Sequence, residues 1–539
     1  MYSLALRCLF LILSSLVSAQ ADGPQVRLNV GTFRGSVFNG TDRFLGIPFA
    51  QAPVGKLRFK APKKITTPLS SVQDALQFGD ACPQPGSVAS LGAPMGEDCL
   101  RLNVWRPLNA TARDKLPVIV WMYGGVYNTG AASMAELDGT RFVTRSLAIG
   151  KPLIFVSINY RVNTFGFLAS KFVAVEDLNN GLKDQVAALE FVQENIAAFG
   201  GDPEKVTIWG QSAGAGSVLS HIVYPTSQTL FRGAIMDSEV GPFKNSPPPE
   251  AFDAPGKAFD VILKGTGCPA NESAFACLQE VPFETLANVS NAFVSETLNN
   301  QFWEPTIAPG SFLPVRASTR IAAGDFLHIP IIIGTNLNEG ATFSDSLLNL
   351  NVTGSAELAS MDEFIKASVI TESLITPDVL STIHELYPAN TELLPHSTGD
   401  SLFDRTSAWY GDHMFLAARR RFVDVASQHQ PTFVYHFREP IPGNDPRLGV
   451  VAHATELPLL FGNPLPAPDV ELEFANAFLD FYISFVNDLN PGGNWPRFST
   501  KSLQILQLMR DNITAITDDF RRGRTDFLNL PEVLNEWQR

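Results

Sequence analysis

Residues 208–217 of this 539-residue chain have the sequence IWGQSAGAGS, between two apolar runs. Seven of these ten residues are Gly, Ala or Ser. Residues 206–209 predict a buried strand before the stretch, and residues 217–223 are compatible with a helix after it. Small side chains at such a junction indicate either a glycine turn that lets two elements pack closely or a serine exposed for chemistry.

The five residues from Gly210 to Gly214 match the pattern Gly-x-Ser-x-Gly. A serine at a sharp turn from strand to helix is held in a strained backbone conformation and projects above the carboxyl edge of a sheet. We expect glycine at both ends because a Cβ there would collide with the facing strand or helix. The flanking strand and helix therefore favour Ser212 as a nucleophile over a plain glycine turn.

The wider pattern of apolar runs predicts an α/β fold. Runs typical of buried parallel strands occupy residues 116–122, 153–158, 206–209 and 329–333. Between them, residues 184–196 have the apolar spacing of a helix. Strands alternating with helices predict a mostly parallel central sheet flanked by helices.

Two further regions complete this organisation. Residues 26–37 alternate weakly, which predicts a small antiparallel strand pair. Residues 246–408 are richer in proline, asparagine and glycosylation sequons, and we interpret them as large insertions that decorate the sheet. No linker separates them, so we expect residues 20–539 to form a single catalytic domain.

A serine hydroxyl needs a base to take its proton, and histidine suits this task near neutral pH. His221 follows the glycine-rich turn in a predicted helix, His413 lies in a helical stretch, and His436 lies in a strand-like run at 432–437. His453 lies instead in a loop after that run. A loop histidine at the carboxyl end of a strand can reach the serine, so His453 is the predicted base.

The base in turn needs a carboxylate that fixes its tautomer and stabilises the imidazolium. Glu339 lies in a loop just past the strand predicted at 329–333, and the order Ser212, Glu339, His453 is the one expected for this architecture. Asp345 remains a rival acid. Backbone N–H donors for an oxyanion come from Ala213 and from the YGGVY segment at 123–127, whose alternative is a simple glycine turn.

Charge and the N-terminal segment limit the partners and the location. A net charge of −14 repels phosphate backbones, so we expect no nucleic-acid partner. Residues 1–19 combine Arg7, an apolar stretch and small residues near Ala19, the layout of a cleavable secretory signal. The apolar stretch is shorter than the roughly 20 residues that span a bilayer, so we expect no stable membrane anchor.

A secreted protein is expected to carry disulfides and glycans. Removal of the signal leaves Cys82, Cys99, Cys268 and Cys277, and of three possible pairings we favour Cys82–Cys99 with Cys268–Cys277. Their spacing lacks Cys-x-x-Cys, so neither zinc nor another metal is expected. The N-glycosylation sequons lie at Asn39, Asn109, Asn271, Asn288, Asn351 and Asn512.

Several motifs together resemble the type-B carboxylesterase/lipase family of α/β-hydrolases, which includes the cholinesterases. They extend from residue 26 into the late 400s and include FLGIPFA (44–50), PVGKLRF (53–59), EDCLRLNV (97–104), NYR (159–161), NGLKDQ (180–185), FGGDP (199–203) and GQSAG (210–214). The resemblance implies an α/β-hydrolase fold and a secreted serine carboxylic-ester hydrolase acting on small-molecule esters without a cofactor. It implies Ser212 as nucleophile, His453 as base and Glu339 as its partner.

The resemblance also implies roles for neighbouring residues. Gly125, Val126 and Ala213 would donate to the oxyanion, and both disulfides would pair as above. Ser238 resembles the family's buried serine that supports the catalytic carboxylate. Phe302 and Trp303 fall roughly where the family lines its acyl site with aromatics, although core packing explains them equally well.

Departures from the family pattern narrow the expected substrates. Val126 stands where Gly or Ala is usual, and we expect its methyl groups to narrow the space for the leaving alcohol. The loop between Cys82 and Cys99 lacks the tryptophan with which cholinesterases hold a quaternary ammonium, and Gln211 stands where they carry glutamate, which argues against choline esters. Three prolines in this loop argue against a lid helix, so soluble or short-to-medium esters are expected.

Two other classes remain open. Some proteins of this fold are adhesion proteins that have lost the catalytic residues, but the serine, glutamate and histidine are present here. A peptidase is disfavoured because amide cleavage on this fold usually accompanies a differently organised cap domain. The sequence makes no prediction of the oligomeric state.

Overall fold

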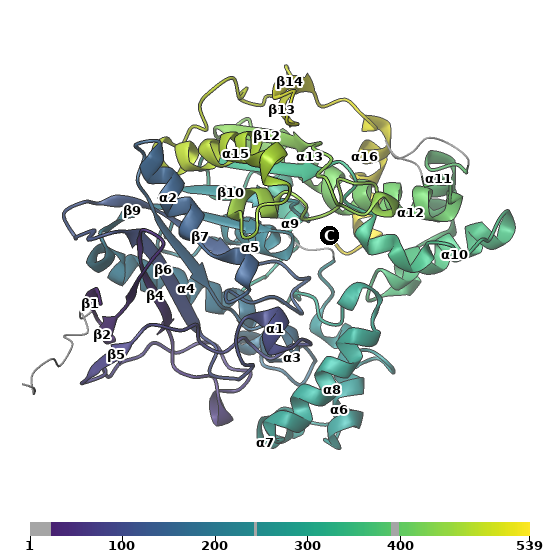
Figure 1. The fold of residues 1–539 in the computed structure, drawn as a ribbon. Coiled ribbons are helices and arrows are strands. Elements are labelled where there is room, and N and C mark those ends of the chain that lie inside the picture. The colour runs from purple at the N-terminus through teal and green to yellow at the C-terminus, as the bar shows by residue number, and fades with distance from the viewer. Residues whose placement is uncertain (1–22, 242–244, 390–397) are drawn as a thin grey trace, which may run out of the picture.

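The structure is a computed structural model that describes residues 23–241, 245–389 and 398–539. The secretory signal predicted at residues 1–19 lies outside these ranges. The centre of the fold is an 11-stranded sheet with the order β14-β13-β12-β11-β10-β9-β7-β8-β6-β4-β3 (Figure 1). Its strands are β3 (Ser36–Phe38), β4 (Thr41–Pro48), β6 (Arg101–Pro107), β7 (Leu116–Met122), β8 (Ile154–Ile158), β9 (Gly201–Gln211), β10 (Gly233–Asp237), β11 (Ile331–Asn336), β12 (Thr432–Phe437), β13 (Gln504–Leu508) and β14 (Thr514–Thr517).

All neighbouring strands from β13 to β8 are parallel, which confirms the predicted mostly parallel sheet. Antiparallel pairs close both sides, through β6, β4 and β3 at one edge and β14 at the other. The four predicted strand runs became β7, β8, β9 and β11. The weak N-terminal alternation became the antiparallel pair β1 (Gln25–Leu28) and β2 (Gly31–Arg34), joined by β5 (Val72–Asp74).

Helices cover both faces of the sheet (Figure 1). One face packs against α4 (Asn180–Asn195), α5 (Ala213–Val223) and α13 (Ala417–Ala426), and the other against α2 (Thr140–Ala148), α14 (Leu457–Phe461) and α15 (Pro468–Asp488). Short helices connect these layers: α1 (Val88–Leu91), α3 (Asn163–Phe167), α9 (Ala317–Ala322), α16 (Arg522–Leu528) and α17 (Pro531–Glu536). None of the helices in the described ranges is long and apolar enough to cross a membrane.

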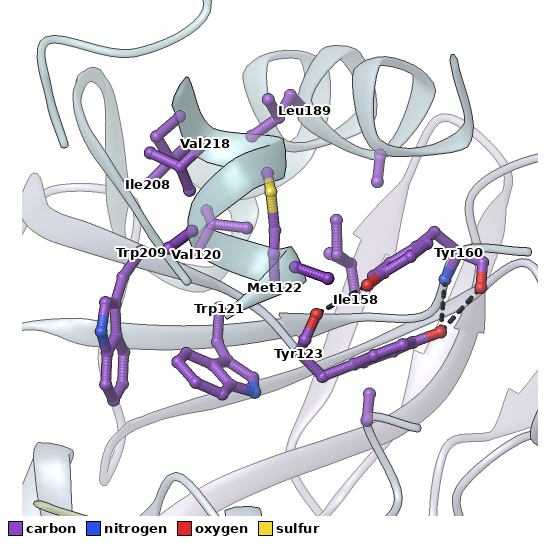
Figure 2. Packing of buried hydrophobic residues seen from close by; sticks show 14 of the residues in the cluster. Val120, Trp121, Met122, Tyr123, Ile158, Tyr160, Leu189, Ile208, Trp209 and Val218 are labelled. Atoms are coloured by element: carbon purple, nitrogen blue, oxygen red, sulfur yellow. Dashed lines mark hydrogen bonds between the residues drawn. The ribbon is translucent and has the colours of Figure 1, made fainter. Parts of the chain in front are cut away.

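The alternation of side chains along β7 explains why both layers are needed. Val120 and Met122 point toward α4 and α5, whereas Trp121 points to the opposite face (Figure 2). There its ring lies 4.2 Å from that of Trp209, and Phe461 of α14 packs on both indoles. Because successive residues of a strand face opposite sides, a strand that is apolar throughout must be covered on both.

The region interpreted as insertions contributes helices beside the sheet, as Figure 1 shows. They are α6 (Ala258–Thr266), α7 (Ala274–Glu280), α8 (Phe283–Glu296), α10 (Ser355–Ala367), α11 (Pro377–Leu386) and α12 (Ser401–Gly411). The last three build a second apolar cluster, which includes Ile365, Ile383 and Trp409. The same region also supplies β11, a central strand, so part of it belongs to the sheet itself.

The disulfides pair as the sequence predicted, and the glycosylation sequons lie at the surface. The structure joins Cys82 to Cys99 and Cys268 to Cys277. All six sequon asparagines are exposed. The loop between Cys82 and Cys99 contains only the four-residue helix α1, whose N-cap is Ser87.

We predict that Gly214→Ala destabilises the fold. A Cβ at Gly214 would lie 2.1 Å from the carbonyl oxygen of Met122, so α5 would have to move away from β7. A clash with backbone in the core is expected to cost about 3 kcal/mol or more in the free energy of unfolding, measured by thermal or denaturant unfolding. Gly523→Ala, where a Cβ meets no atom within 4 Å, is the control and should change stability by about 1 kcal/mol or less. Equal stability of the two variants would contradict the prediction.

Candidate active site

Ser212 lies at the junction of β9 and α5 with φ 58° and ψ −125°, a backbone conformation that non-glycine residues rarely adopt. Two hydrogen bonds hold it there: Ser212 N–H donates to the carbonyl of Asp237 at 2.9 Å, and Gly216 N–H donates to the carbonyl of Ser212 at 2.8 Å. A Cβ at Gly210 would lie 2.3 Å from the carbonyl carbon of Gly214. The glycines therefore allow the strand and helix to meet closely enough to strain the serine.

His453 and Glu339 come together from neighbouring loops. His453 Nδ1 lies 2.6 Å from Glu339 Oε2. Both residues follow parallel neighbours, β11 and β12, and Asn338 N–H donates to the carbonyl of Val451 at 3.0 Å, which joins the two loops. The rival acid, Asp345, lies exposed on a 3-10 turn. The structure thus brings the predicted histidine to the predicted glutamate.

The second carboxylate oxygen of Glu339, Oε1, is held by two hydrogen-bond donors. Oε1 accepts hydrogen bonds from the Ser238 hydroxyl at 2.7 Å and from Asn336 N–H at 2.6 Å. Ser238 follows β10 with φ 54°, so its short side chain turns toward the carboxylate. With both oxygens engaged, the carboxylate has one orientation, and that orientation presents Oε2 to the imidazole.

The other ring nitrogen of His453, Nε2, faces Gln211, the residue before Ser212. Nε2 lies 3.1 Å from Gln211 Nε2, and the ring packs against both Phe343 and Phe415, with centroids 5.0 and 4.9 Å away. Among the described residues, the Ser212 hydroxyl has no hydrogen bond to this nitrogen. Catalytic hydrogen bonds are often loose without substrate, and a turn of the Gln211 amide frees the position.

A stacked tyrosine pair positions the backbone after β7. The rings of Tyr123 and Tyr160 lie 4.3 Å apart at 14°, and each hydroxyl donates to the other residue's carbonyl, at 2.7 and 2.6 Å (Figure 2). The chain then turns through positive φ at Gly125 and Val126. Among the described residues, the N–H groups of Gly125, Val126 and Ala213 donate to no other group.

Two cavities border the turn that carries Ser212 and differ greatly in size: Ser212 lines the smaller one, and its neighbour Gln211 lines the larger. The larger cleft measures about 460 Å³ and is lined by Gln84, Pro85, Ser90, Leu91, Trp121, Tyr123, Gly124, Gly125, Thr129, Gly130, Met134, Glu136, Leu137, Gln211, Ala454, Leu457 and Pro458. The smaller cavity measures about 20 Å³ and is lined by Val126, Tyr127, Ser212, Ala213, Val240, Gln301, Glu304, Phe343, Tyr410, Met414 and Phe415. Val126 therefore borders the small cavity and not the cleft.

The predicted aromatic acyl residues lie elsewhere, which corrects that expectation. The Trp303 indole donates to Thr164 Oγ1 at 2.9 Å and packs against Phe252. Phe302 stacks on Phe293. Both side chains pack in the core, whereas Gln301 and Glu304 of the same irregular segment line the small cavity.

Comparisons with known proteins decide the family. Residues 22–528 match the sequence profile described as the carboxylesterase family. The chain belongs to the carboxylesterase family. It is 33% identical to "Secreted lipase 1" of Botryotinia fuckeliana, covering 96% of this chain and 94% of that protein, and 32% identical to "Para-nitrobenzyl esterase" of Bacillus subtilis, covering 92% and 96%.

Solved structures agree with the family. Aspergillus niger EstA matches with a TM-score of 0.81 at 26% identity, covering 96% of this chain and 99% of that one. A PNB esterase matches with a TM-score of 0.77 at 30% identity, covering 93% and 99%. The sheet described above is thus that of an α/β-hydrolase, and this carboxylesterase is a carboxylic ester hydrolase.

The three other histidines considered as bases from the sequence are buried. His221 is buried, its Nε2 lies 2.8 Å from Gln185 Oε1, and burial lowers its pKa to about 4. His413 stacks on Trp409, and burial lowers the pKa of His436 well below its usual value. In the part of the chain that the structure describes, no hydrogen bond joins any of these three to Ser212.

Sequence reasoning missed a buried polar group beside the small cavity. Glu304 is 3% exposed and Tyr410 1%, and Gln301 Nε2 donates to the Tyr410 hydroxyl at 3.2 Å. Behind them lie the Glu239 carboxylate and the Arg539 guanidinium, both buried. The one available signal was the charge of Glu304 within the otherwise uncharged run 301–307, QFWEPTI.

We predict that Glu239 makes stability depend on pH. Burial raises the pKa of its carboxyl from 4.5 to about 7, so the folded state holds a proton that the unfolded state releases. Its contribution is fully present below pH 4.5 and is lost as the pH rises through 7, a change of ~3 kcal/mol. Glu239→Gln removes this dependence, so the variant should gain stability relative to wild type between pH 4.5 and 8, measured by thermal unfolding. Parallel pH profiles would contradict it.

Proposed function

We propose that this carboxylesterase is a secreted serine hydrolase that cleaves uncharged esters through an acyl-enzyme, with Ser212 as nucleophile, His453 as base and Glu339 as its partner. The observation that carries the proposal is the 2.6 Å contact between His453 and Glu339, made where Ser212 is strained at the sheet edge. A fixed carboxylate selects the tautomer whose Nε2 can accept a proton.

In the first step, the Ser212 oxygen bonds to the ester carbon while His453 Nε2 takes the serine proton. The carbonyl oxygen becomes negative, and the N–H groups of Gly125, Val126 and Ala213 donate to it. The imidazolium then protonates the alcohol oxygen as its bond to carbon breaks. Water repeats the sequence on the acyl-enzyme, which releases the acid and restores Ser212.

Secretion is supported by several independent features. The N-terminal sequence has the layout of a cleavable signal, both disulfides close short loops, and the sequon asparagines are exposed. Two similar proteins are named secreted lipases. The mature chain, residues 20–539, acts as one catalytic domain in this proposal, because β11 within the insertion region completes the central sheet.

Esterase rather than lipase chemistry is favoured by the loop between Cys82 and Cys99. Its only helix, α1, has four residues. So short a helix offers little apolar surface to an oil–water interface. The absence of aromatic residues from the same loop disfavours cationic choline esters.

We predict that Ser212→Ala lowers kcat for p-nitrophenyl acetate by about 10³-fold or more, since the nucleophile is lost. Wild type should also be labelled by a fluorophosphonate, and the variant should not. Ser295→Ala, on the exposed side of α8, is the matched control and should behave as wild type. Labelling of Ser212→Ala, or undiminished hydrolysis, would refute the assignment.

A second pair of variants separates the two candidate acids. Glu339→Gln should lower kcat about 10²–10⁴-fold, because an amide no longer fixes the His453 tautomer or stabilises the imidazolium. Asp345→Asn, at an exposed position on the turn Thr342–Leu347, should leave kcat within about twofold of wild type. Steady-state kinetics at constant pH measures both, and a greater loss in Asp345→Asn would reverse the roles.

A further inference from the structure

The direction of His453 Nε2 distinguishes the small cavity at Ser212 from the larger cleft beside Gln211. Nε2 faces Gln211, and both Gln211 and Ala454, the neighbour of His453, line the 460 Å³ cleft. In the proposed mechanism this nitrogen must protonate the leaving alcohol. The alcohol therefore lies in the cleft, and the acyl group lies on the opposite side of Ser212, in the 20 Å³ cavity.

The acyl side is too small for a chain. A volume of about 20 Å³ holds about one water molecule, which is close to the size of a methyl group. Val126 borders this cavity, so its methyl groups narrow the acyl side and not the alcohol side, contrary to the expectation from sequence. Phe343 and Met414 complete walls that leave room for an acetyl group and little more.

Part of the lining of the small cavity is polar. Gln301 donates to the Tyr410 hydroxyl, and Glu304 lies beside them, all more than nine-tenths buried. An alkyl chain could lengthen only by separating this hydrogen bond and by contacting a buried carboxylate. Burial of one methylene strengthens binding roughly fourfold. A methylene of the acyl chain that finds no apolar site does not contribute this factor. The small volume of this cavity and its polar lining thus both disfavour long acyl chains.

The alcohol side offers the opposite environment. Its cleft is lined by large apolar side chains, among them Trp121, Leu137 and Leu457, and is more than twenty times the volume of the acyl cavity. Such a cleft can bury the greater part of an extended alcohol.

We propose, on the basis of the function proposed above, that this enzyme is selective for acetate-sized esters of large apolar alcohols. The acyl group enters the small cavity closed by Gln301 and Tyr410, and the alcohol occupies the cleft. Gln301 and Glu304 are then the residues that limit acyl length.

Octyl acetate and ethyl octanoate test this directly, because they are isomers of equal composition whose ester group is reversed. We expect kcat/KM for octyl acetate to exceed that for ethyl octanoate at least tenfold, measured with dissolved ester below its solubility limit. A ratio below tenfold in wild type overturns the proposal, whatever the variants do.

The variant Gln301→Ala tests whether the Gln301 side chain limits the length of the acyl group. It enlarges the small cavity, so kcat/KM for ethyl octanoate should rise about fivefold or more, and the ratio should fall accordingly. Gln428→Ala, the same change at an exposed position on the end of α13, should keep the wild-type ratio. A folded Gln301→Ala variant with an unchanged ratio overturns the assignment of the small cavity to the acyl group.

Different results would refute the proposed function itself. Hydrolysis of neither isomer nor of p-nitrophenyl acetate by wild type, or hydrolysis retained in Ser212→Ala, would refute the triad itself. Hydrolysis that depends on Ser212 but favours ethyl octanoate would leave the triad intact and refute only the acyl selectivity.

Discussion

The close approach of α5 to β7 and β9 is the constraint on which the site depends. Gly214 leaves no room for a Cβ beside the carbonyl of Met122, and Gly210 leaves none beside Gly214. This contact aims the first N–H of α5, that of Ala213, at the space beyond β7, where Gly125 and Val126 present theirs. It also imposes the positive φ of Ser212, which lifts the hydroxyl above the sheet. One backbone contact therefore brings together the proposed nucleophile and both halves of the proposed oxyanion site.

The remaining catalytic groups follow from the parallel order of β10, β11 and β12. Loops at the carboxyl ends of adjacent parallel strands are neighbours, so Ser238, Glu339 and His453 form a chain across three strands. Beneath it, Asp237 accepts hydrogen bonds from Trp209, Tyr435 and Tyr482, and burial raises its pKa to about 6. Burial also raises the pKa of Glu456 well above its usual value. A raised pKa means that the Glu456 carboxyl tends to hold its proton, so it adds little negative charge beside Glu339.

The sequence predicted the parts that obey local rules. The strand β7 and the second half of β9 are apolar runs, so both could be recognised in the sequence. The glycines at 210 and 214 could be recognised too, because a Cβ at either position would meet backbone. β10 was not, because the five residues GAIMD contain too few large apolar side chains to distinguish a strand. The triad could be predicted because its order along the chain and the positions of its loops agree with the strand pattern.

Side-chain direction in irregular segments could not be predicted. Residues 301–304 have no regular structure to fix which members face the cavity, and the aromatic pair turned to the core while Gln301 and Glu304 turned to the site. Likewise, the left-handed backbone at Val126 decides which cavity its methyl groups border, and sequence alone does not reveal that φ.

The proposed catalytic groups and the groups proposed to set specificity therefore come from different parts of the chain. The serine, its base, the acid and the N–H donors all come from strand ends of the sheet, whose geometry is shared by the relatives described above. The groups that close the small cavity, Gln301, Glu304 and Tyr410, come from the inserted segments beside it. Because these side chains carry none of the hydrogen bonds that orient His453 and Glu339, acyl length can change by substitution there without disturbing the triad.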